Sequence, residues 1–210
     1  MTRIVVVDDH VMLVQGIKKL LEGREGLIVV GEATDGREGI ALVKQLQPDI
    51  AILDITMPGL NGIDAARAIA KTAPRTKMIL LTMHKENPYV IEALDAGVHG
   101  YVVKSQTGAD LLRAIEEVLA NRVYLSPGIA QLVVDAYRHK TRPETDPLTF
   151  REREVLQLIA EGQRTKQIAV LLGISVKTAE SHRTRIMAKL DVHETANLVR
   201  YAIRRGLVNP

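Results

Sequence analysis

The sequence predicts an α/β domain with a doubly wound, five-stranded parallel sheet, followed by a small all-α domain. Up to about residue 120, short aliphatic runs alternate with amphipathic segments of helical period. From residue 148 onward, only short helical segments follow one another. The charge divides as well: residues 1–125 hold 14 Lys and Arg against 16 Asp and Glu (net −2), and residues 126–210 hold 14 against 9 (net +5). We therefore expect two domains with different partners, the second a candidate for binding nucleic acid.

Five aliphatic runs predict the strands of the first domain, because short apolar runs bounded by turn residues are typical of buried parallel strands. The runs are residues 4–7, 27–30, 50–53, 78–82 and 100–103. Five such repeats with intervening helices predict helices on both faces of the sheet, and we expect the flavodoxin-like strand order 2-1-3-4-5.

Capping signals predict where the intervening helices begin and end. The signals are the capping-box pairs Asp35 with Glu38 and Thr107 with Asp110, the start Asn87 with Pro88, and the terminating Gly97.

A linker is expected between the two domains. Residues 126–139 fit one more amphipathic helix, and residues 139–147 (HKTRPETDP) are polar, with two prolines and no apolar period. We place the first domain at residues 1–121, the linker with its helix at 122–147 and the second domain at 148–210.

The second domain is expected to consist of four short helices. Thr149 and Glu152 have the spacing of a capping box at the start of the first helix, and Gly162 ends it. The other helices are expected at residues 166–172, at residues 176–190 after a turn at Gly173, and over about ten residues from Glu194.

The composition is that of a globular protein, with 46% hydrophobic and 25% charged residues. The longest aliphatic runs fall far short of the roughly 18 apolar residues that a membrane span needs. Arg3 precedes a four-residue apolar run that ends at Asp8 and Asp9, which is not the pattern of a signal peptide. The chain has no cysteine, which excludes disulfides and thiolate metal sites. We expect a cytoplasmic protein that contacts no membrane.

Polar side chains follow the predicted strands of the first domain. They are Asp8 and Asp9 after the first strand, Asp54 after the third, Thr82 at the end of the fourth and Lys104 after the fifth. In an open α/β sheet, ligands bind at this edge, where strand order reverses. Three carboxylates in one pocket repel one another unless a cation relieves them, and Mg²⁺ suits oxygen ligands.

A carboxylate can also accept a phosphoryl group, while Mg²⁺ and the Lys104 ammonium neutralise charge and Thr82 donates a hydroxyl. Taken singly, each residue has an ordinary explanation: a helix cap for Asp8 or Asp9, a solvated loop lysine, a strand threonine. Five polar residues at the strand ends of one sheet favour a site.

Four motifs resemble the receiver domain of bacterial two-component response regulators over about residues 1–120. They are VVVDDH at 5–10, ILDITMPGLNG at 52–62, LLTMH at 80–84 and GYVVKS at 100–105. The resemblance implies that Asp54 accepts a phosphoryl group from a sensor histidine kinase. It implies further that Mg²⁺ is the cofactor, with its ligands drawn from Asp8, Asp9, Asp54 and the Thr56 carbonyl.

The resemblance also assigns a switch to the first domain. Thr82 and Lys104 would contact the phosphoryl oxygens, and Tyr101 matches the family's switch aromatic, whose ring turns inward as Thr82 moves; the alternative is a half-buried strand aromatic. Ser105 departs from the family, since many receivers have proline after this lysine. His84 is expected beside the route of a hydrolytic water, or simply on the surface.

Residues 166–190 have helix-turn-helix form, with small Ala169, the turn Gly173 and the capping Ser175. In the second helix a stripe at helical period is expected in the core: Val176, Ala179, His182, Ile186 and Leu190. The opposite face carries Lys177, Glu180, Ser181, Thr184 and Arg185, which are suited to a major groove or equally to a solvated surface.

Residues 148–208 resemble the LuxR-type DNA-binding domain, on the segments LTFREREVLQLIAEG, IAVLLGISVKTAESHRTRIMAKL and LVRYAIRRGLV. With the receiver, the whole chain resembles the NarL/FixJ subfamily of transcriptional regulators. The resemblance implies contacts with double-stranded DNA through Lys177, Thr178, Glu180, Ser181, Thr184 and Arg185. It also implies that the last helix, including Leu198 and Ala202, helps two DNA-binding domains pair.

We therefore expect a phosphorylation-controlled transcription regulator, with a homodimer when phosphorylated and RNA polymerase as a further candidate partner. The receiver is expected to catalyse only its own phosphorylation and dephosphorylation. Two alternatives stay open: a DNA-binding regulator independent of phosphorylation, and a haloacid-dehalogenase-like phosphatase. The phosphatase requires a second Asp two positions after the nucleophile on the first strand, where His10 stands.

Overall fold

The computed structural model describes residues 1–83, 87–104, 108–138 and 146–208. The chain divides into two compact units, one comprising Met1–Met57 and Asn61–Pro143, the other comprising Pro58–Leu60 and Glu144–Pro210. His84, Ser105 and Thr107 lie outside the described residues, as does most of the polar stretch expected as a linker.

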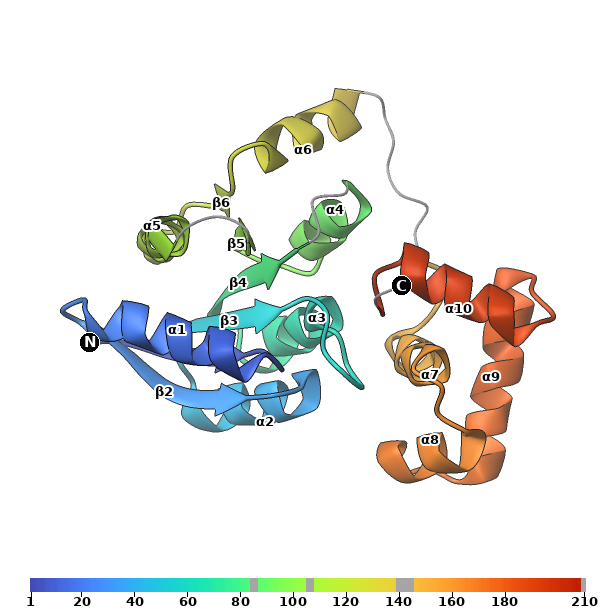
Figure 1. The fold of residues 1–210 in the computed structure, drawn as a ribbon. Helices are drawn as coiled ribbons and strands as arrows, with labels where there is room; N and C mark the ends of the chain where they lie inside the picture. The colour runs from blue at the N-terminus through green and yellow to red at the C-terminus, as the bar shows by residue number, and fades with distance from the viewer. Residues whose placement is uncertain (84–86, 105–107, 139–145, 209–210) are drawn as a thin grey trace. The chain divides into compact units, whose positions relative to one another are not determined.

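A parallel sheet forms the centre of the first unit (Figure 1). Its strands are β1 (Thr2–Val7), β2 (Leu27–Ala33), β3 (Ile50–Asp54), β4 (Lys77–Thr82), β5 (Gly100–Val103) and β6 (Tyr124–Leu125). The order β2-β1-β3-β4-β5-β6 confirms the predicted arrangement of the first five strands. The sixth strand was not predicted, because two residues are too few to show a strand period.

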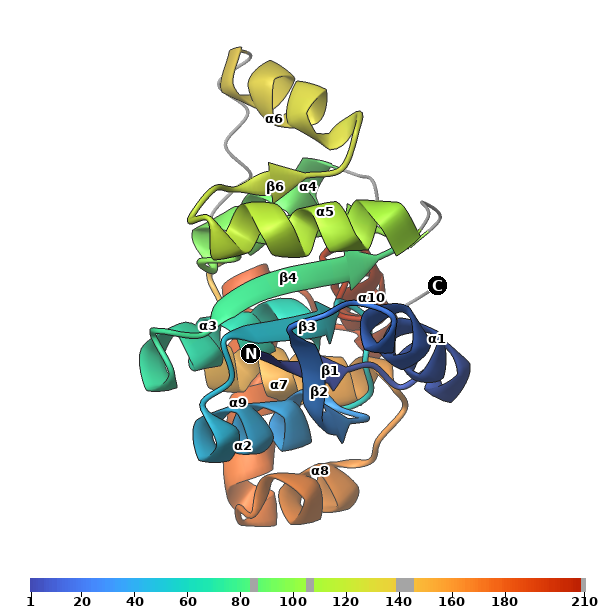
Figure 2. The same cartoon turned by 90° about the vertical axis from the view of Figure 1, so that its left-hand side faces the viewer.

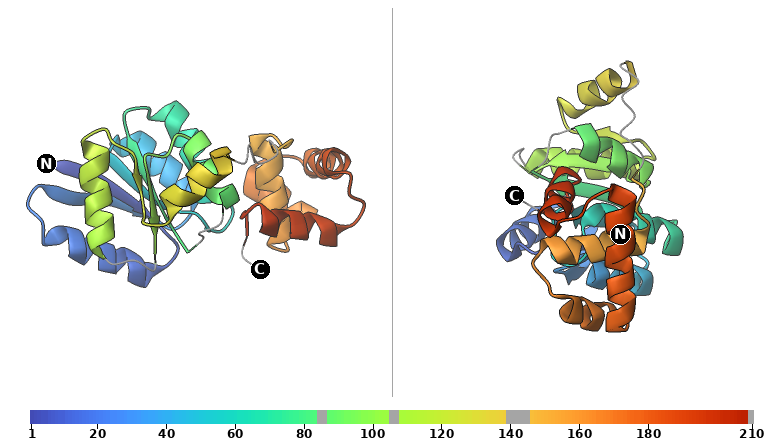
Figure 3. Two further views of the ribbon diagram at one scale, coloured as in Figure 1. Left: turned by 90° about the horizontal axis from the view of Figure 1, so that it is seen from above. Right: turned by 90° about the vertical axis from the view of Figure 1, so that its right-hand side faces the viewer.

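Helices cover both faces of this sheet. They are α1 (Val11–Glu22), α2 (Gly36–Leu46), α3 (Gly62–Thr72), α4 (Asn87–Asp95), α5 (Gly108–Leu119) and α6 (Ile129–Arg138). One apolar cluster joins alternate strand residues to α1 and α5, and a second joins the others to α2, α3, α4 and α6. Figure 2 shows the backbone of these helices around the strands. Seen from above, α5 lies on one side of the sheet, and α4 with α6 on the other (Figure 3, left). The doubly wound prediction is therefore confirmed.

The helix ends of the first unit follow the predicted signals in part. Asp35 caps α2 by accepting hydrogen bonds from two backbone N–H groups, while the Glu38 carboxylate accepts from Thr34 N–H and not from Asp35 itself. Gly97 has a positive φ of 85° and follows α4, as expected. Asp110 lies in the first turn of α5 and accepts hydrogen bonds from the side chains of Tyr124 and Ser126.

Four helices form the second unit: α7 (Phe150–Ala160), α8 (Thr165–Leu172), α9 (Val176–Leu190) and α10 (Thr195–Arg204). The capping box of Thr149 and Glu152 is present at the start of α7. Gly173 ends α8 with a φ of 62°, and the Ser175 hydroxyl then caps α9 by accepting from Thr178 N–H. The helix-turn-helix is therefore built from the turn residues that predicted it.

The core of the second unit contains Ala179 and Ile186 of α9, both buried, with Leu190 packed against them. His182 is half-buried. Val176, expected in this stripe, is 38% exposed, because it is the first residue of the helix and lies at the edge of the core. No helix within the described ranges combines the length and apolar character that a bilayer span requires.

Candidate phosphoryl-acceptor site and DNA-binding surface

The carboxyl ends of β1, β3, β4 and β5 bring four of the predicted residues together. β3 lies between β1 and β4, and Thr82 is paired with Val103 at the end of β5. Asp8 and Asp54 are 1% and 4% exposed, and Thr82 is completely buried. Lys104 follows β5, and its N–H donates to the Thr82 carbonyl at 2.7 Å.

Lys104 links the two buried carboxylates. Its Nζ lies 2.8 Å from Asp8 Oδ2 and 2.9 Å from Asp54 Oδ2, and its side chain is only 10% exposed. An ammonium this close to buried carboxylates interacts with them far more strongly than a surface lysine would. The solvated-loop explanation of Lys104 is therefore wrong.

Asp54 has an unusual protonation equilibrium. Burial raises its pKa from the ordinary 3.8 to about 6, the neighbouring Asp8 and Asp9 add to this increase, and Lys104 opposes it. The carboxylate is therefore mostly ionised at neutral pH, but at a cost that a further cation would relieve.

Asp8, Asp9, His10 and Asp54 each offer a ligand atom, and these atoms lie within 4.8 Å of one another. His10 was not predicted to belong to this cluster, although it directly follows the two aspartates in the sequence. Its Nδ1 lies 3.1 Å from Asp8 Oδ1 and 2.9 Å from Asp9 Oδ1. His10 is also the N-cap residue of α1, and its backbone N–H donates to Asp8 Oδ1 at 2.9 Å. The cluster can hold a metal ion.

The donor set of this cluster suits Mg²⁺. Three carboxylates face a single Lys104 ammonium, so a divalent cation balances the remaining charge, and carboxylate oxygens are ligands that Mg²⁺ prefers. Asp9 has a side chain 32% exposed, which leaves the cluster open to water on one side.

Thr56 and Tyr101 are the remaining predicted residues of the first unit. Thr56 is half-buried, two residues beyond Asp54. Tyr101 is completely buried in the apolar cluster on the face of α4 and α6, which contradicts the half-buried alternative.

Gly62 fixes the backbone of the acceptor residue. A Cβ at this first residue of α3 would lie 1.9 Å from the Asp54 carbonyl oxygen, so only glycine fits here. The Gly62 N–H donates to the Ile55 carbonyl at 2.8 Å, and the Asn61 side chain caps α3 by accepting from Asp64 N–H. The loop after β3 is thereby tied to the start of α3.

The outer face of α9 carries the residues predicted to contact DNA. Lys177, Thr178, Glu180, Thr184 and Arg185 are exposed, and Ser181 is half-buried. The hydroxyls of Ser181 and Thr184 donate to the backbone carbonyls of Lys177 and Glu180, so their oxygens stay available as acceptors. Figure 3 (right) shows α9 as an unbroken helix.

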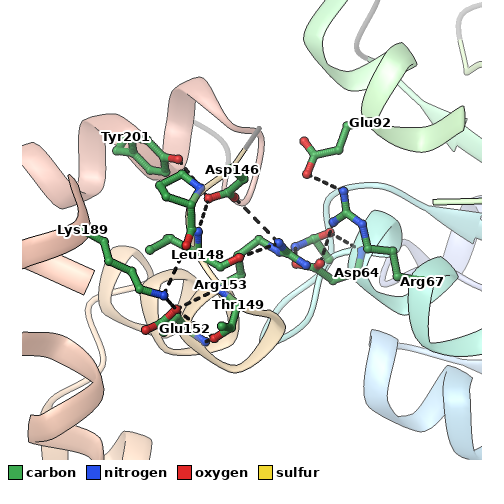
Figure 4. Close-up of polar contacts among 12 residues, drawn as sticks. Asp64, Arg67, Glu92, Asp146, Leu148, Thr149, Glu152, Arg153, Lys189 and Tyr201 are labelled. Carbon is green, nitrogen blue, oxygen red and sulfur yellow. Dashed lines mark hydrogen bonds and ion pairs between the residues drawn. The ribbon is translucent and has the colours of Figure 1, made fainter. Parts of the chain in front are cut away.

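The charged groups of α9 divide into tethered and untethered ones. Arg183 donates to Thr195 Oγ1 at 2.6 Å, and Lys189 lies 2.6 Å from the Glu152 carboxylate (Figure 4). Lys177 and Arg185 form no ion pair within the part of the chain that the structure describes. Their charges are therefore available to a polyanion.

The scaffold behind α9 is held by the Glu152 carboxylate. Burial alone would raise the pKa of Glu152, but the Lys189 ammonium and the hydrogen bonds from Thr149 outweigh it and hold the pKa at about 2. Glu152 therefore connects the start of α7 to the end of α9.

Two residues of the last helix are packed inside their own unit. Leu198 and Ala202, predicted to help two DNA-binding domains pair, are completely buried within the core of their own unit. Pairing through α10 would have to use other residues of this helix, five of which line a pocket of about 520 Å³ together with Leu190 and Val192: Asn197, Arg200, Tyr201, Ile203 and Arg204.

Comparison with known proteins agrees with both units. Residues 4–116 match the model of the response regulator receiver domain, and residues 146–202 match that of the luxR family of bacterial regulatory proteins. The transcriptional regulatory protein LiaR of Bacillus subtilis is 36% identical, with 100% of each chain covered. The response regulator UvrY of Escherichia coli is 34% identical, covering 100% of this chain and 97% of UvrY.

A solved structure shows the same two-part fold. RcsB from Salmonella enterica serovar Typhimurium, bound to promoter rprA in the presence of the phosphomimetic BeF3−, is 30% identical. The match covers 95% of this chain and 97% of RcsB, with a TM-score of 0.63.

Proposed function

Because the chain belongs to the NarL/FixJ-type response regulators, with a receiver domain and a LuxR-type DNA-binding domain, we propose that phosphorylation of Asp54 controls its binding to DNA. This proposal rests mainly on the position of the Lys104 ammonium, which lies 2.9 Å from Asp54 and 2.8 Å from Asp8 in a buried acidic pocket. The chain is thus a transcription regulator of a two-component system and not a classical enzyme; its own phosphorylation is the only chemistry we assign to it.

In the proposed reaction, an Asp54 carboxylate oxygen forms a bond to phosphorus while the phosphorus–nitrogen bond of a kinase phosphohistidine breaks. The donor's imidazole leaves and takes up a proton. Lys104 and the Thr82 hydroxyl stabilise the charge on the phosphoryl oxygens, and the protein mainly supplies position and electrostatics. A sensor histidine kinase is therefore the proposed partner of the receiver.

We assign the metal site to Asp8, Asp9, Asp54 and the Thr56 carbonyl. When bound, Mg²⁺ neutralises the negative charge that accumulates on the transferring group. Asp9→Ala should weaken Mg²⁺ binding without changing the acceptor, and an unchanged titration would remove Asp9 from the ligand set.

Thr82 and Tyr101 are proposed to convert the modification into a change of conformation. An aspartyl phosphate adds negative charge and acceptor oxygens beside Thr82, and this charge biases a two-state element of which Tyr101 is part. A homodimer would then read two half-sites through Lys177, Thr178, Glu180, Ser181, Thr184 and Arg185.

The test is phosphoryl uptake measured by intact mass. Wild type, Asp54→Asn and, as a control, Asp49→Asn are incubated with acetyl phosphate and Mg²⁺, and oligomeric state and DNA affinity are then measured. Wild type and the control should gain one phosphoryl group, shift toward dimer and bind DNA more tightly, whereas Asp54→Asn should do none of these.

Labelling of Asp54→Asn would remove Asp54 from the acceptor role. Uptake without a change in DNA affinity would favour the phosphorylation-independent alternative. DNA affinity should also fall steeply with salt, because a phosphate-led interface releases counterions; a flat dependence would contradict this interface. The phosphatase alternative has no support from the family, and steady turnover of phosphate esters would be needed to restore it.

A further inference from the structure

Ser126 joins the unpredicted strand β6 to the end of β5. It directly follows β6 and is completely buried. Its N–H donates to the Tyr101 carbonyl at 2.9 Å, and its Oγ accepts from Val103 N–H at 3.1 Å. The side chain thus continues the hydrogen-bond ladder by one step, where Pro127 prevents the strand from continuing.

Val103 is the residue before Lys104, so this hydrogen bond acts on the backbone that carries the ammonium. Val103 is 1% exposed, and a buried N–H without an acceptor is costly. On the other side, Lys104 N–H donates to the Thr82 carbonyl of β4. The segment is therefore held both from β4 and from Ser126.

Asp110 sets the direction of the Ser126 hydroxyl. Ser126 Oγ lies 2.5 Å from Asp110 Oδ2, and because the hydroxyl proton is directed there, the oxygen lone pairs are left to accept from Val103. The other Asp110 oxygen accepts from the Tyr124 hydroxyl, whose pKa is raised to about 12 by burial and by this hydrogen bond. Tyr124 therefore remains a donor at neutral pH.

We infer that Ser126, oriented by Asp110, is a positioning residue for phosphoryl transfer, which holds the end of β5 so that Lys104 faces Asp54. This inference rests on the proposed function of Asp54. Ser126 does not touch the acceptor; it acts through the Val103 backbone and Lys104.

Three variants test this role in the full-length chain. Ser126→Ala removes the acceptor of Val103 N–H, and Asp110→Asn weakens its orientation. Tyr124→Phe is the matched control, since it removes the neighbouring hydrogen bond to Asp110 but leaves Ser126 and Val103 joined.

The rate of phosphoryl gain is measured by intact mass against acetyl phosphate concentration with saturating Mg²⁺, together with amide hydrogen exchange of residues 100–104. We expect the maximal rate of Ser126→Ala to fall about tenfold, the fold-change that corresponds to losing one buried hydrogen bond behind Lys104. Its half-saturating acetyl phosphate concentration should not change, and Val103 N–H should exchange faster. Asp110→Asn should show a smaller loss, and Tyr124→Phe should stay within about twofold of wild type.

An unchanged maximal rate in Ser126→Ala would overturn the inference, even if Val103 exchanges faster, because the hydrogen bond would then be structural only. An equal loss in Tyr124→Phe would also overturn it, since the effect would belong to the whole segment. If wild type itself gains no phosphoryl group, the proposed function of Asp54 is refuted. If wild type and Ser126→Ala gain it at the same maximal rate, only the inference about Ser126 is refuted.

Discussion

Replacing Asp54 by asparagine should stabilise the first unit at neutral pH and leave it unchanged in acid. The carboxyl group is 4% exposed, and its pKa in the folded protein is about 6 against an ordinary 3.8. Because the folded pKa is raised, the stability that the protonated form contributes is complete below about pH 4 and is lost as the pH rises through 6. Asparagine does not ionise, so the variant avoids this loss.

The expected size follows from the pKa difference. A difference of about two units corresponds to about 3 kcal/mol in the free energy of unfolding. The variant and wild type should therefore be about equally stable near pH 4, and the variant more stable by about 3 kcal/mol at pH 8 without Mg²⁺. Saturating Mg²⁺ should reduce this difference, since a ligand of the folded state stabilises wild type through Asp54.

The measurement is hydrogen exchange of the slowest β3 amides in increasing urea, between pH 4.5 and 8, which reports on the first unit alone. Asp95→Asn, at the exposed end of α4, is the matched control and should follow wild type. A stability difference that does not grow with pH would refute the reasoning, because the pKa of Asp54 would then be the same in the folded and the unfolded protein.

Lys177→Ala should weaken DNA binding about tenfold in a fluorescence anisotropy titration, because the interface loses a cation that no ion pair tethers. The control Lys19→Ala, at an exposed lysine of the first unit, should bind DNA like wild type. Equal affinities of Lys177→Ala and wild type would show that Lys177 lies outside the interface. Glu152→Ala should destabilise the second unit by about 1–3 kcal/mol, measured by urea unfolding, and Glu152→Gln by less, since Gln can keep the capping box. Because the pKa of Glu152 is about 2, the stability that its carboxylate contributes is complete above about pH 4.5 and is lost as the pH falls. Equal losses of stability in Glu152→Ala and Glu152→Gln would show that the capping box contributes nothing. Gly62→Ala should destabilise the first unit by about 3 kcal/mol in thermal melting, because the added Cβ would lie 1.9 Å from the Asp54 carbonyl oxygen. The control Gly16→Ala has open space around it and should be neutral or stabilising. A tolerated Gly62→Ala would contradict the close approach.

The sequence predicted the five long strands and the turn residues of the helix-turn-helix because both depend on local patterns. A short apolar run bounded by turn residues marks a buried strand, and Gly173 followed by Ser175 marks a turn and a cap. The acidic cluster was also predictable, since topology alone places the strand ends together.

What the sequence could not predict depends on contacts distant along the chain. Asp110 has the spacing of a capping box, but its carboxylate accepts hydrogen bonds from side chains 14 and 16 residues later. Leu198 has the same apolar character whether it faces its own core or a second copy, and only the packing shows that it faces the core. His10 joins the acidic cluster through the path of the chain after β1.

The short strand β6 changes where a fragment of this protein can be cut. A fragment ending at residue 121 would lack β6, so β5 would become an edge strand with unpaired N–H and C=O groups. It would also uncover the apolar side chains that Ile129, Leu132 and Val133 of α6 now shield. The uncovered edge could pair with the same edge of a second copy, so a dimer seen in such a fragment would not by itself show self-association of the whole chain. A fragment that keeps α6 closes the edge and is the one in which self-association can be attributed to phosphorylation.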